Sequence, residues 1–219
     1  MHRGQLRELQ CRKPLVGGSL PPPRDGRNLF TIGDSITAGG TDEIDGLGWP
    51  YHLRQELDNA QADYWWQEKP VRFAAGGETV ATIKAGIDAY LATVSDVPYY
   101  ALILLGANDI GAGWDNLTEA SWKADYRYIL DALRAKWPSV LIYLGKSFRD
   151  GAGEEAKLAI LAGWIDDLVA ENPSYLFNTF NSMDFLDGHP ELFPEGDNVH
   201  PNHAGMIVMA QYWLTALGY

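Results

Sequence analysis

The stretch LFTIGDSIT, residues 29–37, decides the fold of this chain. Its first four residues are apolar, aromatic or β-branched, which predicts a buried strand over residues 29–32. Gly33 predicts a turn, so Ser35 is expected just past the carboxyl end of this strand. Ligands and reacting groups gather at that edge of an open α/β sheet, which makes Ser35 a candidate nucleophile. A Gly-Asp-Ser turn without a catalytic role is the alternative interpretation.

Three further motifs follow along the chain. GGET at residues 76–79 and GAND at residues 106–109 each come after an apolar run, and DNVHPN occupies residues 197–202. The last motif supplies a carboxylate and an imidazole three residues apart, close enough for both to reach one site. With all four motifs in this order and at these spacings, residues 28–219 resemble the SGNH hydrolases, also called the GDSL esterase/lipase family.

The resemblance implies a catalytic triad of Ser35, His200 and Asp197. A serine hydroxyl is almost fully protonated at neutral pH and attacks poorly without a base. His200 has the side chain for this role, since a histidine pKa near ~6.5 allows it to take the serine proton and return it to a leaving group. Asp197 is expected to hold the imidazole tautomer and to stabilise the imidazolium.

The same resemblance implies an oxyanion hole of three donors, the Ser35 N–H, the Gly77 N–H and the side-chain amide of Asn108. Gly76 is adjacent, but Gly77 is preferred because the acid and the threonine that the family often has there follow it directly. The chain departs from the family pattern at residues 73–75, which are Phe-Ala-Ala where an asparagine often precedes the glycine. This departure concerns a supporting hydrogen bond and not the donor itself.

Asp34, Trp114 and Val199 are the candidates for substrate contact. Asp34 and Asp109 are also interpreted as acids that brace their loops, and not as acid/base catalysts. Three loops are expected to line the pocket, at residues 44–49, 111–114 and 183–193.

The apolar periodicity alternates between strands and helices along the rest of the chain. The predicted strands cover residues 29–32, 71–75, 99–105 and 140–144, with a fifth beginning at 175–177; the predicted helices cover residues 49–57, 79–91, 117–137, 154–170 and 201–217. This alternation predicts an α/β fold, a three-layer α/β/α sandwich around a five-stranded parallel sheet. The family resemblance implies the same flavodoxin-like fold, with strand order 2-1-3-4-5.

Composition indicates a globular protein. Of the 219 residues, 46% are hydrophobic and 21% charged, and no apolar run approaches the ~20 residues that span a bilayer, so integral membrane association is not expected. Residues 1–27 form a basic leader with six Arg or Lys against two acids, and residues 28–219 are expected to form one domain. The formal net charge is −12, and it is −16 beyond the leader, where 11 basic residues face 27 acidic ones. Such an acidic body argues against nucleic acid as a partner.

The leader contains no apolar segment of the length found in an intact secretory signal. Two native compartments are therefore both compatible with the sequence: the cytoplasm, or the outside of the cell if a secretory signal is missing. Cys11, the only cysteine, lies in this leader, so no intrachain disulfide is expected.

Hydrolysis of short-chain carboxylic esters through an acyl-enzyme intermediate is the expected activity, with no metal or organic cofactor. Short acyl groups are favoured because the chain shows no long apolar insertion that could act as a lipid lid. The expected partner is a small-molecule or carbohydrate ester, and removal of acetyl groups from a carbohydrate such as xylan is the main alternative. Lysophospholipase and thioesterase activities are less favoured.

Two other classes of protein remain as alternatives. A non-catalytic module would bind a sugar or a lipid on a tryptophan-rich rim formed by Trp65, Trp66 and Trp114. A metallohydrolase would hold a divalent ion with carboxylate and imidazole ligands drawn from Asp187, His189, Asp197, His200 and His203.

Overall fold

The computed structural model describes residues 29–40, 48–60, 71–95, 97–111, 113–149 and 154–219. The predicted leader with Cys11, the pair Trp65 and Trp66, and residues 44–47 of one expected pocket loop lie outside these described residues.

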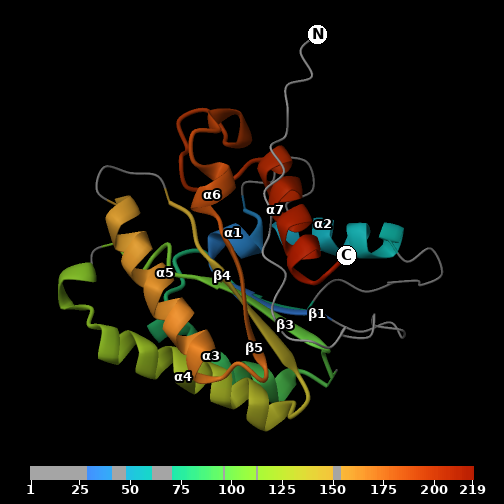
Figure 1. Cartoon of the computed structure of the whole chain (residues 1–219), viewed down its shortest axis with the longest axis vertical. Coiled ribbons are helices and arrows are strands. Elements are labelled where there is room, and N and C mark those ends of the chain that lie inside the picture. Colours follow the sequence, from blue (N-terminus) through green and yellow to red (C-terminus); the bar gives the residue numbers. More distant parts are fainter. Residues whose placement is uncertain (1–28, 41–47, 61–70, 96, 112, 150–153) are drawn as a thin grey trace.

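Five parallel strands form one sheet in the order β2-β1-β3-β4-β5 (Figure 1), which confirms the predicted topology. Every residue of the central strand β3 is buried, as expected for a strand that is covered on both faces. The strands are β1 (Leu29–Gly33), β2 (Val71–Ala74), β3 (Tyr100–Leu105), β4 (Leu141–Lys146) and β5 (Leu176–Asn181).

Helices pack against both faces of this sheet, which confirms the three-layer arrangement. Successive residues of β3 point to opposite faces, so Ile103 lies in one hydrophobic core and Leu102 in the other. One core is completed by α3 (Val80–Thr93), α4 (Glu119–Lys136) and α5 (Glu154–Glu171), and the other by α2 (Gly48–Ala60) and α7 (His203–Ala216). Figure 1 shows α3, α4 and α5 together on one side of the sheet, with α2 and α7 on the other.

Helix starts follow the capping residues in the sequence. Thr79 accepts a hydrogen bond from Thr82 N at 3.2 Å and donates its own N–H to Thr82 Oγ1 at 2.8 Å, which fixes the first turn of α3. Thr118 caps α4 in the same way. Asn202 caps α7, with its Oδ1 3.1 Å from Gly205 N.

The boundaries of all five strands differ from the prediction by one or two residues. β4 continues through Gly145 and Lys146, which were predicted to begin a loop, and β5 continues to Asn181. Four single-turn elements were not predicted: α1 (Ser35–Ala38), α6 (Met183–Leu186) and the 3-10 turns η1 (Trp114–Asn116) and η2 (Pro190–Leu192). Across the described ranges, every helix is too short or too polar to cross a membrane.

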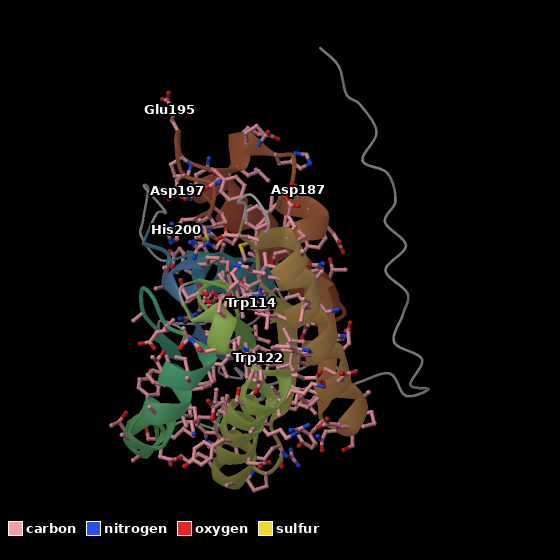
Figure 2. The ribbon with its side chains drawn as sticks, turned by 90° about the vertical axis from the view of Figure 1, so that its left-hand side faces the viewer. Trp114, Trp122, Asp187, Glu195, Asp197 and His200 are labelled. Atoms are coloured by element: carbon pink, nitrogen blue, oxygen red, sulfur yellow. The ribbon has the colours of Figure 1, made fainter. Side chains whose placement is uncertain are left out.

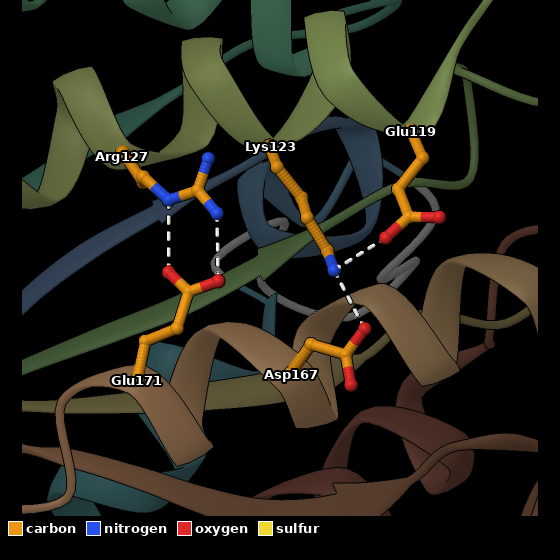
Figure 3. A network of polar contacts seen from close by, with 5 residues as sticks. All are labelled: Glu119, Lys123, Arg127, Asp167 and Glu171. Atoms are coloured by element: carbon orange, nitrogen blue, oxygen red, sulfur yellow. Dashed lines mark hydrogen bonds and ion pairs between the residues drawn. The ribbon is translucent and has the colours of Figure 1, made fainter.

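A row of ion pairs joins α4 to α5 (Figure 3). Lys123 Nζ lies 2.6 Å from both Glu119 Oε1 and Asp167 Oδ2, and the Lys123 side chain is only 8% exposed. One turn further along α4, Arg127 forms a two-point contact with Glu171, with Nη2 2.6 Å from Oε1 and Nε 2.8 Å from Oε2. The Arg127 side chain is 43% exposed, so solvent screens this second pair more strongly.

Lys123→Met is therefore expected to lower the free energy of unfolding by about 1 kcal/mol, and Arg127→Met by roughly half as much or less. The Lys123 partners are more than half exposed and remain hydrated after its removal, which keeps the loss small. Urea denaturation of the two variants measures the difference, and an equal or reversed order of the two losses would contradict this ranking.

Candidate active site

Three side chains from the two ends of the chain form a hydrogen-bonded line at the carboxyl edge of the sheet. Ser35 begins α1 directly after β1, and its Oγ lies 2.8 Å from His200 Nε2. His200 Nδ1 lies 2.9 Å from Asp197 Oδ2. Ser35 and His200 are separated by 165 positions in the sequence, so only the fold brings them together. In Figure 2, Asp197 and His200 lie on the upper segment that leads into α7.

The Asp197 carboxylate is held by its own loop. Its Oδ1 accepts hydrogen bonds from Val199 N at 2.8 Å and from His200 N at 2.9 Å. Partial burial opposes ionisation, but these bonds and the His200 ring outweigh it, so the pKa of Asp197 is lowered from its ordinary value. An ionised carboxylate can only accept, which places the His200 proton on Nδ1 and leaves Nε2 to accept from the Ser35 hydroxyl. Val199, a predicted substrate contact, is half-buried and contributes its N–H to this loop.

The two other predicted oxyanion donors lie on the loops that follow the neighbouring strands. Gly77 is exposed and has a φ of +80°, a left-handed conformation that glycine adopts without strain. Asn108 follows β3, and its Nδ2 donates a hydrogen bond to Glu78 O at 3.0 Å. This bond uses one of the two amide N–H groups, and the second remains to donate to another acceptor.

Asp109 braces the turn after β3. It is 7% exposed, and its Oδ1 accepts from Val80 N at 3.2 Å and from Trp122 Nε1 at 3.1 Å. Burial raises the pKa of Asp109 to about 6, although these two hydrogen bonds act in the opposite direction. The placement fits the bracing role that the sequence analysis gives to this residue.

Asp34 is fully buried beside Ser35. Its Oδ1 accepts from Ile36 N at 3.0 Å, which caps α1, and its Oδ2 has no hydrogen-bond partner among the described residues. Burial raises the pKa of Asp34 to about 7, and the nearby Asp109 carboxylate adds to this increase. An enclosed side chain is placed to brace the turn, which differs from the substrate contact that the sequence analysis predicts.

Trp114 lies in η1 and is partly buried against the core of α3, α4 and α5. Its ring is nearly parallel to that of Trp164 at 6.2 Å, and Lys157 Nζ lies 5.8 Å from its centre. In Figure 2, Trp114 lies lower in the view than Asp197 and His200. Much of this ring is therefore engaged in packing.

A cavity of about 770 Å³ lies against Asp197. Its walls combine apolar side chains, among them Leu186 and the stacked pair Phe148 and Phe193, with the acids Glu191 and Glu195. Figure 2 shows Glu195 at the top of the view, above Asp197 and His200. The loop predicted at residues 183–193 thus contributes residues 186 and 188–191 as well as Phe193, whereas Phe148 and residues 194–198 were not predicted to line a pocket.

In the part of the chain that the structure describes, no three His, Cys, Asp or Glu side chains are arranged to hold a metal ion. His189, one ligand of the metallohydrolase alternative, instead pairs with Glu191, with Nδ1 2.9 Å from Oε1.

Comparisons with known proteins bear on this site. The model of the GDSL-like Lipase/Acylhydrolase family matches residues 31–207. No curated protein matches the chain significantly. Several solved structures share the fold at low sequence identity. Axe2, an acetylxylan esterase from Geobacillus stearothermophilus, is 20% identical with a TM-score of 0.69, and the match covers 89% of this chain and 95% of that one. TesA is 19% identical (TM-score 0.68, coverage 88% and 98%), and LAE5, an α/β hydrolase enzyme from the metagenome of Lake Arreo, Spain, is 22% identical (TM-score 0.67, coverage 88% and 95%).

Asp34→Asn is expected to change how stability depends on pH. The carboxyl has an ordinary pKa of 3.8 and a folded-state pKa of about 7. Its ionisation therefore destabilises the folded protein: this loss of stability is absent below pH 3.8, grows as pH rises, and is complete above about pH 7. Asparagine keeps the acceptor for Ile36 N and does not ionise. The free energy of unfolding of the variant relative to wild type should rise by on the order of 3 kcal/mol between about pH 4 and pH 8 in urea titrations. A pH-independent difference would contradict the burial of a titrating carboxyl.

Proposed function

Because the chain belongs to the GDSL-like Lipase/Acylhydrolase family, we propose that it is a serine esterase that hydrolyses short-chain carboxylic esters. The observation that carries this proposal is the hydrogen-bonded line from Ser35 Oγ through His200 to Asp197. It gives a serine hydroxyl what nucleophilic attack requires, a base on the hydroxyl and a carboxylate on the far side of that base.

In the first step, Ser35 Oγ attacks the acyl carbon of the ester while His200 Nε2 takes the hydroxyl proton. The new C–O bond forms as the carbonyl electron pair moves onto the carbonyl oxygen, which gives a tetrahedral intermediate with one negative charge. Asp197 stabilises the imidazolium that results, and its lowered pKa keeps it ionised while it does so.

The oxyanion of this intermediate is proposed to accept hydrogen bonds from Ser35 N–H, Gly77 N–H and the free N–H of the Asn108 amide. Donors held in place before the reaction stabilise charge as it develops, and the loss of one such donor typically costs ~10²–10³ in rate. The bond from Asn108 to Glu78 O supports this role, because it fixes the orientation of the amide before a substrate arrives.

Collapse of this intermediate completes acylation: His200 gives its proton to the leaving alcohol as the bond between the acyl carbon and that oxygen breaks, and the acyl group stays on Ser35. Water then attacks the Ser35 acyl ester, with His200 as base and the same three donors around the oxyanion. Collapse of this intermediate releases the carboxylic acid and returns the proton to Ser35. No step requires a metal or an organic cofactor.

We propose that the leaving alcohol extends toward the cavity beside Asp197, whose lining favours an uncharged alcohol. Glu191 and Glu195 line it, and no Lys or Arg is among its described lining residues, so a phosphate-bearing alcohol or a coenzyme A thioester would be repelled. Removal of acetyl groups from a carbohydrate is the second candidate. Phe193, which is half-buried and lines the cavity beside carboxylates, suits a sugar, and the similar structure Axe2 is an acetylxylan esterase.

Hydrolysis of p-nitrophenyl esters from acetyl to palmitoyl tests the proposal. The wild type is expected to turn over the acetyl and butyryl esters fastest, and Ser35→Ala to lower kcat/KM by on the order of 10⁴ because the nucleophile is lost. Ser174→Ala, which alters an exposed serine in the turn before β5, serves as the matched control and should leave the rate unchanged.

Activity that survives in Ser35→Ala and is abolished by a chelator would instead support the metallohydrolase alternative. Acetate release from acetylated xylan at a rate above that of the acetyl aryl ester would favour the carbohydrate candidate. An absence of turnover on every ester would contradict the esterase proposal and favour the binding module.

A further inference from the structure

The loop that carries Gly77 has little packing of its own. Gly76 and Gly77 are exposed, and no heavy atom lies within 4 Å of where a Cβ of either would be. The one backbone hydrogen bond within the loop, from Glu78 N to Ala75 O, is 3.5 Å long. A donor to a developing oxyanion must nevertheless be held within a few tenths of an ångström of its working position. The restraint on Gly77 must therefore come from another part of the chain.

Two adjacent residues of the turn after β3 supply that restraint. Asn108 Nδ2 donates to Glu78 O at 3.0 Å, and Val80 N donates to both Asp109 carboxylate oxygens, at 3.2 and 3.3 Å. These bonds restrain Glu78 and Val80, the residues on either side of Thr79, in the segment that directly follows Gly77. The Val80 N–H is the first of α3 and has no partner within the helix, so a carboxylate is well suited to accept it.

Asp109 is itself held by other parts of the chain, through both its carboxylate and its backbone. Trp122 Nε1 in α4 donates to Oδ1 at 3.1 Å, and Asp109 N donates to Gly106 O at 3.2 Å. Arg149 Nη1 and Lys157 Nζ hold the backbone of the same turn, at 3.3 Å from Ala107 O and 3.2 Å from Ile110 O. The turn is thus a rigid support between α4 and α5, from which the exposed loop is held.

We propose that Asp109 is a positioning residue of the oxyanion hole, whose carboxylate sets the distance between the Gly77 N–H and the Asn108 amide. The inference rests on the proposed esterase function and adds to it a residue that acts through others. Asp109 does not contact the reacting atoms in this account.

The positioning depends on the charge state of Asp109. The ionised carboxylate accepts from Val80 N with both oxygens and from Trp122 Nε1 with Oδ1, whereas protonation places a hydrogen on one oxygen and weakens the contact with Val80 N. Burial raises the pKa of Asp109 to about 6, so the contact is complete above that pH and weakens as pH falls through it.

The ionisable groups around Asp109 act in both directions: Arg149 and Lys157, which bind carbonyls of the same turn, favour its negative charge, and nearby carboxylates disfavour it. Asp34 approaches from the turn after β1, and Asp125 and Tyr126 from α4. The two carboxylates disfavour a further negative charge, and Tyr126 is a buried neutral phenol. Lys84 of α3 is engaged with Asp125 at 2.9 Å.

Asp109→Asn tests the proposal because asparagine keeps the shape and one acceptor but loses the charge. Its kcat on p-nitrophenyl acetate is expected to fall ~10–100-fold with KM changed by less than about twofold, since oxyanion donors act on the transition state. As pH falls through about 6, the Asp109 carboxyl of the wild type becomes neutral like the asparagine, so the ratio of wild-type kcat to variant kcat should shrink toward 1.

Lys123→Met is the matched control. Lys123 lies one residue from Trp122 on α4 and contributes to stability, but it contacts neither the turn nor the loop. The kcat of Lys123→Met should equal that of the wild type at neutral pH and as the pH is lowered through 6. If Asp109→Asn behaves as this control does, with lower stability and a kcat equal to that of the wild type at every pH, Asp109 has only a structural role and the proposal is overturned.

Hydrogen exchange separates this outcome from a failure of the esterase proposal. In Asp109→Asn the hydrogen-bonded amides of residues 78–80 should exchange ~10-fold faster than in the wild type at neutral pH, whether or not any ester is turned over. Unchanged exchange there would overturn the positioning role. The absence of turnover in the wild type that Ser35→Ala can lower would overturn the proposed function alone.

Discussion

The parallel pairing of β1 with both β2 and β3 is the constraint on which the candidate site depends. Gly33, the last residue of β1, lies opposite Ala74 of β2 and Leu104 of β3, so the three strands end at nearly the same level. The segments that follow them carry Ser35, Gly77 and Asn108. Each residue is only a few positions beyond its strand, so the sheet sets the spacing of these groups, and the loops need only small local adjustments.

This arrangement buries two carboxyl groups next to the proposed chemistry. Asp34 caps the turn of Ser35, and Asp109 joins the turn of Asn108 to α3, and burial raises the pKa of both. Each group lowers stability at neutral pH, because the folded protein must hold a desolvated charge or bind a proton. Both carboxyl groups accept hydrogen bonds from backbone N–H groups and so help to orient candidate catalytic residues. Residues that reduce the stability of the fold are expected at functional sites.

Local patterns in the sequence predicted the five strands, the helix start at Thr79 and the motifs that meet at one edge of the sheet. They did not predict that β4 continues through Gly145, because glycine alone suggests a loop. A Cβ there would lie 2.9 Å from a Leu104 methyl group and 3.0 Å from the Trp213 ring, so the glycine reflects close packing of α7 on the sheet. Contacts between distant residues, such as Asp109 with Val80, have no local pattern.

The most direct test of the central claim is to identify the residue that reacts with a phosphorylating ester such as diethyl p-nitrophenyl phosphate. The oxygen of a serine activated by His200 should displace p-nitrophenol and retain the diethylphosphoryl group, which mass spectrometry of the digested protein locates. The account predicts stoichiometric modification of Ser35, loss of esterase activity in proportion, and no modification in His200→Ala. Full inactivation with Ser35 unmodified, or equal modification of Ser35 without His200, would contradict it.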